Sequence, residues 1–142
     1  MTECENLKFK SAGYIQINVP ALDVDFKDII IDEKNKSDWE KMKMFDLKMH
    51  NPEPTYRAYS MANSPAEGNI IMLNIRIATP PFDRAAGAFT PVNPGICSSF
   101  ILSRQPGDKV TISGPSGEFF LRETTNDMCF TGCGYGSAPL RI

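Results

Sequence analysis

Three side chains in one short segment are of types that could bind a cofactor. Arg57, Tyr59 and Ser60 belong to the run Arg-Ala-Tyr-Ser-Met-Ala-Asn at residues 57–63. In a β-strand, Arg57 and Tyr59 share one face and Ser60 lies on the other. Arginine offers a planar fork to two phosphate oxygens, tyrosine a flat ring with a polar tip, and serine a small hydrogen-bonding group. The segment therefore indicates a flavin with its diphosphate, as in FAD, although an exposed strand with a solvated Arg57 fits it equally well.

A second cluster of small residues favours the cofactor interpretation. Residues 95–101 read Gly-Ile-Cys-Ser-Ser-Phe-Ile and follow Asn93 and Pro94, a pattern that predicts a helix start. Glycine permits a close backbone approach, and the first N–H groups of a helix, at the positive end of its dipole, attract phosphate. A serine-capped surface helix would also explain the serines. Taken with residues 57–63, the cluster indicates a phosphate-bearing cofactor.

These two segments, in this order, resemble the flavin domain of the ferredoxin–NADP reductase superfamily, where an Arg-x-Tyr-Ser strand and a later Gly-x-x-Ser helix start share one FAD. Residues 13–18, 57–63, 71–81 and 113–120 narrow the resemblance to the F subunit of the sodium-translocating NADH:quinone oxidoreductases. The resemblance covers most of the chain. It implies a mainly β fold, a small antiparallel Greek-key barrel with a short helix at the phosphate site.

The resemblance also implies a role for each matching residue. Arg57 is expected to contact the FAD diphosphate, Tyr59 to lie against the isoalloxazine ring, and Ser60 to hydrogen-bond near flavin N5, so Tyr59 and Ser60 are the expected catalytic residues. Cys97 is interpreted as a small packing residue rather than a redox thiol. The other expected cofactor-binding residues line the flavin, approach its edge or bind phosphate; with Cys97 they are Met61, Ala62, Asn63, Ile77, Ala78, Thr79, Gly95, Ile96 and Ser98.

The end of the chain changes character. A short apolar run begins at Met128 and leads into a glycine-rich stretch that contains Gly132, Gly134, Gly136 and Pro139. By the resemblance, this is the first strand and turn of an NAD(P)-binding domain, with glycines that allow close approach to a pyrophosphate. We therefore expect an FAD-binding domain over residues 1–127, its upstream strands missing, and a truncated NAD-binding domain over residues 128–142.

In the whole protein, the resemblance implies that NADH reduces FAD and that electrons pass to a [2Fe–2S] centre and on to the other, membrane-bound subunits. NADH and [2Fe–2S] binding are expected only in the full-length protein, on the cytoplasmic side of the bacterial inner membrane, and the fragment is expected to be inactive alone. Two alternatives stay open. The chain could be the flavin reductase component of an oxygenase, or a non-catalytic barrel that serves as an interaction module, in which Arg57 pairs with a carboxylate.

Composition excludes several classes of function. The 142 residues, 42% hydrophobic and 23% charged, are typical of one globular domain. A formal charge of −2 gives no basic footprint for nucleic acid, and no apolar run is long enough to span a bilayer, so the chain is expected to be soluble. Four cysteines and one histidine lack metal-site spacing, so no metal is predicted, and His50 is interpreted as a solvated loop residue.

Hydrophobic periodicity predicts the elements that position these residues. Alternation predicts strands at residues 14–19 and, most strongly, 71–77, and residues 56–61 are interpreted as the strand that carries the cofactor motif. Ser37 is predicted to cap a short helix whose apolar face holds Trp39, Met42 and Phe45. A loop rich in proline, alanine and glycine is predicted over residues 80–94, close to the cofactor, and a further strand over residues 109–113.

Overall fold

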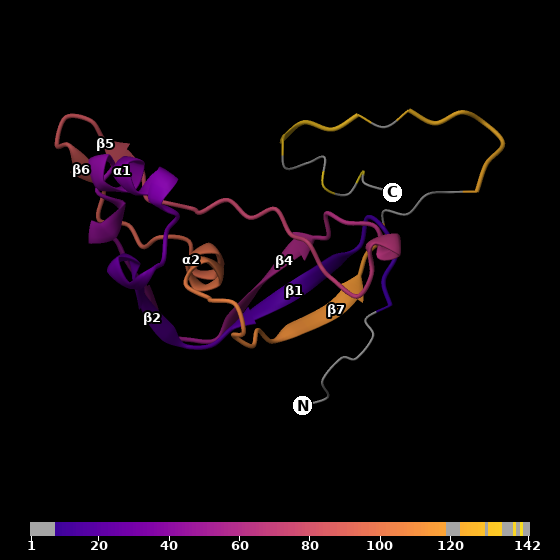
Figure 1. The fold of residues 1–142 in the computed structure, drawn as a ribbon, viewed down its shortest axis with the longest axis horizontal. Coiled ribbons are helices and arrows are strands. Elements are labelled where there is room, and N and C mark those ends of the chain that lie inside the picture. The colour runs from indigo at the N-terminus through magenta and orange to yellow at the C-terminus, as the bar shows by residue number, and fades with distance from the viewer. Residues whose placement is uncertain (1–7, 119–122, 130, 135–137, 139, 141–142) are drawn as a thin grey trace. The chain divides into compact units, whose positions relative to one another are not determined.

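The computed structural model describes residues 8–118, 123–129, 131–134, 138 and 140. They divide into two compact units (Figure 1). Unit 1 takes the described residues within Met1–Ile17, Arg57–Ile75 and Ile112–Ile142, and unit 2 those within Asn18–Tyr56 and Arg76–Thr111. The strands are β1 (Tyr14–Val19), β2 (Leu22–Asp25), β3 (Lys48–Asn51), β4 (Thr55–Ser60), β5 (Phe82–Asp83), β6 (Ala88–Phe89) and β7 (Ile112–Ser116). The helices are α1 (Glu33–Lys41) and α2 (Ile96–Leu102), with 3₁₀ turns η1 (Phe26–Asp28), η2 (Met44–Asp46) and η3 (Pro65–Glu67).

A three-stranded sheet carries the first predicted site segment. Its strand order is β4-β1-β7, and β1 runs antiparallel to β7 (Figure 1). Ile15, Ile17 and Val19 of β1 are buried, whereas the residues between them are half-buried. This is the alternation that the sequence predicts for residues 14–19, and the strands expected there and at residues 56–61 are confirmed.

The strongest alternating run does not form a regular strand. Within residues 71–77 the structure assigns one isolated antiparallel bridge, between Met61 and Leu73, so the predicted strand is wrong. Burial nevertheless alternates along the run, half-buried at odd positions and exposed at even ones. Alternating side chains need only two different environments, whereas a strand also needs a continuous backbone partner. The pattern therefore predicted the faces correctly and the pairing incorrectly.

Unit 2 is built around the antiparallel hairpin of β2 and β3. In its register Val24 lies opposite Met49, and Asp23 opposite His50. Phe26 and Met49 are completely buried in a hydrophobic cluster, and Ile77, Phe89 and Ile96 are among the half-buried residues that pack against it. The buried members of the cluster are Val24, Phe26, Ile29, Met44, Leu47 and Met49.

The helix before β3 begins earlier than its sequence predicts. Helix α1 starts at Glu33 with Asp32 as its N-cap, so Ser37 lies inside the helix and does not cap it. Trp39 packs between Phe26 and Phe45, with ring centroids 6.1 and 5.3 Å away, but Met42 is 51% exposed. A shared face for positions 39, 42 and 45 requires a continuous helix. The helix ends at Lys41, and the left-handed backbone of residue 43 breaks that continuity.

The predicted loop at residues 80–94 contains a short hairpin. Strands β5 and β6 pair antiparallel, and the rings of Phe82 and Phe89 meet edge to face at 5.2 Å. The Asp83 carboxylate accepts hydrogen bonds from the N–H groups of Ala85 and Ala86, at 2.8 and 3.2 Å, which closes the turn. The loop is therefore an ordered excursion rather than an irregular connection.

The described elements confirm a mainly β fold with antiparallel pairings and few helices. Closure of the sheets into one Greek-key barrel stays a prediction, as does the division into domains at residues 127 and 128. No helix in the described part of the chain is long and apolar enough to cross a membrane.

The core of unit 2 generates a stability prediction. Met49 is completely buried, so we expect Met49→Ala to lower the free energy of unfolding by about 2–5 kcal/mol, through lost transfer energy and a residual cavity. Urea denaturation measures this loss. Met42→Ala removes the same atoms at a 51% exposed position and serves as the control, with an expected change below about 0.5 kcal/mol. Equal losses in both variants would contradict the assigned core.

Asp25 adds a pH-dependent contact to the same hairpin. Its carboxylate accepts a hydrogen bond from the Lys27 N–H at 3.2 Å and pairs with the Lys48 ammonium at 3.2 Å. These contacts, the Lys27 hydrogen bond foremost, hold the pKa of Asp25 below its ordinary value of 3.8. A lowered folded-state pKa stabilises the fold above the unfolded-state pKa, and that contribution disappears as the pH falls through the folded-state value.

We therefore expect Asp25→Asn to lower the urea midpoint at neutral pH and to converge with the unmodified chain only as the pH falls through the lowered folded-state pKa of Asp25. Denaturation over a series of pH values checks this. A difference between the two proteins that persists unchanged into acid would show that the ionised carboxylate contributes nothing.

Candidate functional site

Strand β4 presents the first candidate group at the side of the sheet. In the described residues β4 has one neighbouring strand, β1. Arg57 and Ser60 are exposed and Tyr59 is half-buried. A charged fork, a partly covered aromatic ring and a hydroxyl are thus accessible within four residues of one strand. This is the set that the sequence predicts for binding the diphosphate and ring of a flavin.

The next three predicted residues lie in the interior of unit 1. Met61, Ala62 and Asn63 are 1%, 3% and 0% exposed. The Asn63 amide holds the returning chain, because its Oδ1 accepts from the Met72 N–H at 2.8 Å and its Nδ2 donates to the Ile70 carbonyl at 3.0 Å. In this structure their side chains serve packing and backbone pairing. Their contact with a cofactor stays a prediction.

The second candidate group forms at the start of α2, where the structure brings two predicted segments together. The Gly95 N–H donates to the Ala78 carbonyl at 2.7 Å. In return, the Ala78 N–H donates to Ser98 Oγ at 3.1 Å. The hydroxyls of Ser98 and Ser99 both donate to the Gly95 carbonyl, at 3.0 and 2.8 Å. Ala78 is therefore hydrogen-bonded to both Gly95 and Ser98, and we call the segments that these bonds join, residues 77–79 and 95–99, the α2 turn.

Glycine is required at residue 95 because of space, not because of backbone angles. A Cβ on Gly95 would lie 2.6 Å from the Ala78 Cβ and 2.9 Å from Ser98 Oγ, closer than real Cβ atoms come. Its φ of −60° is open to any residue. The missing side chain is what allows the two segments to approach. A glycine at a helix start that lets backbone approach closely fits the phosphate chemistry that the sequence predicts.

Within the α2 turn, backbone groups are better placed for a ligand than side chains. Cys97 is 4% exposed, as expected for a packing residue, and Ile77 and Ile96 pack against the hydrophobic cluster. The single proton of the Ser98 hydroxyl is given to the Gly95 carbonyl. The hydroxyl could donate to a phosphate only after rotating. The first N–H groups of a helix generally have no acceptor within the helix, and their contact with a phosphate here stays a prediction.

The predicted NAD-binding residues lie at the end of the chain, where the structure describes only part of the segment. Gly132 and Gly134 are exposed, whereas Gly136 and Pro139 lie outside the described residues. Met128, Cys129 and Thr131 are not assigned to a strand. The NAD-binding assignment of this segment stays a prediction. Arg57, Tyr59 and Ser60 belong to unit 1 and the α2 turn to unit 2, and each is described by itself.

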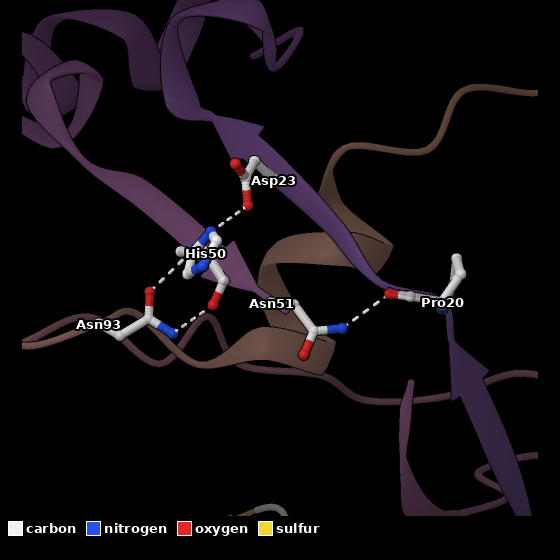
Figure 2. A network of polar contacts seen from close by, with 5 residues as sticks. All are labelled: Pro20, Asp23, His50, Asn51 and Asn93. Carbon is white, nitrogen blue, oxygen red and sulfur yellow. Dashed lines mark hydrogen bonds and ion pairs between the residues drawn. The ribbon is translucent and has the colours of Figure 1, made fainter. Parts of the chain in front are cut away.

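Sequence reasoning missed a polar network next to the α2 turn (Figure 2). His50 is not a loop residue, because it lies in β3, where its ring Nδ1 contacts the Asp23 carboxylate. The Asn93 amide bonds both peptide groups of His50, at 2.9 and 2.8 Å. Beside it, Asn51 donates to the Pro20 carbonyl at 2.7 Å. An Asn-Pro-Gly run signals a turn, but nothing in it indicates a partner 43 residues away.

Comparison with known proteins gives these sites a family. The oxidoreductase FAD-binding domain family matches residues 40–121, which include β4 and the α2 turn. Curated relatives are named as the F subunit of Na(+)-translocating NADH-quinone reductase. The relative from Colwellia psychrerythraea is 55% identical over 96% of this chain and 44% of its own length. Those from Methylococcus capsulatus and Klebsiella pneumoniae are each 50% identical, over 96% and 98% of this chain and 33% of their own lengths.

The chain thus spans less than half the length of these relatives. The family match covers more than half of the chain and includes both candidate groups. This chain belongs to the oxidoreductase FAD-binding domain family.

Proposed function

We propose that this chain is the FAD-binding part of the F subunit of a sodium-translocating NADH:quinone reductase. The observation that carries the proposal is the identity of 50–55% to relatives of that name over nearly the whole chain. An accessible Arg57, Tyr59 and Ser60 on β4 supports the FAD site. Gly95, the N-cap of α2, has no room for a side chain, and this close backbone approach supports the FAD site independently.

Each group of residues has a distinct task in the proposed site. The Arg57 guanidinium binds the diphosphate with two charge-assisted hydrogen bonds. The half-buried Tyr59 ring packs against the flat isoalloxazine, and the exposed Ser60 hydroxyl hydrogen-bonds near N5. The backbone of the α2 turn holds phosphate. When bound, FAD supplies the conversion of a two-electron donor's hydride into single electrons.

The whole protein's reaction belongs to this proposal. The relatives' name implies NADH as electron donor, quinone as acceptor and other subunits as partners. We propose a [2Fe–2S] centre as the acceptor of electrons from FAD in the full-length protein, on the cytoplasmic side of the membrane. Residues 128–142 would begin the NAD-binding domain, so the isolated chain is expected to bind FAD without rapid NADH oxidation.

An oxygenase reductase component would use the same two cofactor motifs. The names of the matched relatives favour the quinone reductase. A non-catalytic interaction module is opposed by the match of both candidate groups to an FAD-binding family.

The proposal is tested by incubating the purified, folded chain with FAD, removing free cofactor by gel filtration and recording the visible absorption spectrum. We expect a retained flavin band approaching one FAD per chain. A folded protein that stays colourless would count against FAD binding by this chain.

Arg57→Ala tests the diphosphate contact. Loss of the two charge-assisted hydrogen bonds, each worth about 1.5–3 kcal/mol, predicts an FAD dissociation constant at least about 100-fold higher. Fluorescence titration measures it. Lys34→Ala removes an exposed cation of α1, outside both candidate groups and outside the loop at residues 80–94, and is expected to leave FAD affinity unchanged. Equal weakening in the two variants would indicate a general charge effect and not a specific contact.

Ser60→Ala separates binding from electron transfer. We expect the FAD dissociation constant to rise by no more than about threefold, because one neutral hydrogen bond at an exposed position contributes about 0.5 kcal/mol net. In the full-length protein, the same substitution is expected to slow flavin reduction by NADH, observed as slower bleaching in stopped-flow absorption. If Ser60→Ala loses FAD as severely as Arg57→Ala, the division of roles is wrong.

Gly95→Ala tests the close approach in the α2 turn. Because the φ of −60° suits alanine, we expect the loss to come from the contacts of the new Cβ, 2.6 Å from the Ala78 Cβ and 2.9 Å from Ser98 Oγ. We expect a lower melting temperature and weaker FAD retention. Pairing it with Ala78→Gly should recover part of both losses by removing the opposing Cβ. An alanine at 95 with unchanged stability and FAD retention would contradict the steric argument.

A further inference from the structure

Asn93 connects the α2 turn to strand β3. Its Oδ1 accepts from the His50 N–H at 2.9 Å, and its Nδ2 donates to the His50 carbonyl at 2.8 Å (Figure 2). One side-chain amide therefore satisfies a donor and an acceptor of the same residue. This is the exchange that a neighbouring strand would make, so Asn93 takes the place of a strand partner at β3.

The register of the β2–β3 hairpin explains why these peptide groups are available. In an antiparallel pair, opposed residues alternate between exchanging backbone hydrogen bonds and pointing them outward. Asp23 and His50 are opposed, and His50 directs its peptide groups to Asn93 and its ring to Asp23. Residues in such outward-pointing pairs have closer side chains, which agrees with the contact between the carboxylate and the ring. The backbone of His50 is thus held by Asn93 and its ring by Asp23.

Asn93 is close enough along the chain to control where the α2 turn lies. Pro94 separates it from Gly95, is buried and has a fixed φ angle, so little freedom remains between residues 93 and 95. Gly95 and Ser98 attach the turn to Ala78. Asn93 adds a polar attachment to His50 of β3. The residue before His50 in this strand, Met49, belongs to the hydrophobic core. The turn is therefore tied to a rigid element.

We infer that Asn93 is a positioning residue for the cofactor-binding α2 turn: it holds the turn against β3 and so sets the arrangement that the cofactor meets. The inference rests on the proposed FAD binding. Asn93 itself does not contact the cofactor in this scheme. Its effect on FAD affinity comes from keeping the backbone of Gly95 and the residues after it in the binding arrangement, which otherwise would have to be restored on binding.

The test compares three variants of the chain, each assayed where circular dichroism shows it fully folded. Asn93→Ala removes both bonds, Asn93→Asp keeps an acceptor but loses the donor, and His50→Ala removes the ring while keeping the peptide groups. FAD affinity is measured by fluorescence titration. Amide hydrogen exchange is measured at Gly95 and Ser99, whose N–H groups donate within the α2 turn, and in β2 as a reference.

We expect Asn93→Ala to bind FAD about three- to tenfold more weakly, the equivalent of one or two modest hydrogen bonds. Exchange should accelerate at Gly95 and not in β2. Asn93→Asp should be intermediate, and His50→Ala should match the unmodified chain in both measurements. Unchanged affinity and exchange in Asn93→Ala would overturn the inference, as would an equal loss in His50→Ala. If the unmodified chain binds no FAD, the proposed function fails, and the exchange at Gly95 alone decides whether Asn93 holds the turn.

Discussion

The α2 turn depends on the close approach of two backbone segments at Gly95 and Ala78. Their hydrogen bond of 2.7 Å exists because residue 95 carries no Cβ, which would lie 2.6 Å from the Ala78 Cβ. Two serine hydroxyls then donate to the Gly95 carbonyl, and one of them also accepts from Ala78. The absence of a side chain at residue 95 therefore permits the hydrogen bonds that join Ala78, Gly95, Ser98 and Ser99. That network brings residues 77–79 to the start of α2, and the proposed phosphate contacts follow from this placement.

Asparagine side chains perform a common task in both units, since they pair with peptide groups where no strand does. Asn63 bonds the backbone of Met72 and Ile70 in unit 1. In unit 2, Asn51 bonds the Pro20 carbonyl and Asn93 bonds both peptide groups of His50. An unsatisfied buried peptide group is costly, and an amide offers both a donor and an acceptor. These contacts let short, irregular segments lie beside the sheets without extending them.

The structure separates residues that shape the candidate site from residues that can touch a ligand. Cys97 and Asn63 are buried and already committed to packing or backbone pairing. Arg57 and Ser60 are exposed, and Tyr59 is half-buried. Motif matching treats all of these positions alike. Burial shows that the charged and hydroxyl groups on β4 are accessible, whereas Cys97 and Asn63 are not, and the contact of the accessible groups with a flavin stays a proposal.

The sequence by itself determined the features that depend on near neighbours. Alternation predicted β1, the Arg-Ala-Tyr-Ser motif predicted β4, and the glycine at residue 95 predicted the start of α2. The same reasoning misplaced the start of α1, assigned His50 to a loop and made a strand of residues 71–77. Only the tertiary structure decided these features. A strand needs a paired backbone, and the strand position of His50 depends on Asp23 opposite it, and both partners come from other parts of the chain. A sequence pattern shows which face of a helix or strand is apolar. Folding decides which distant backbone group each residue of that element contacts.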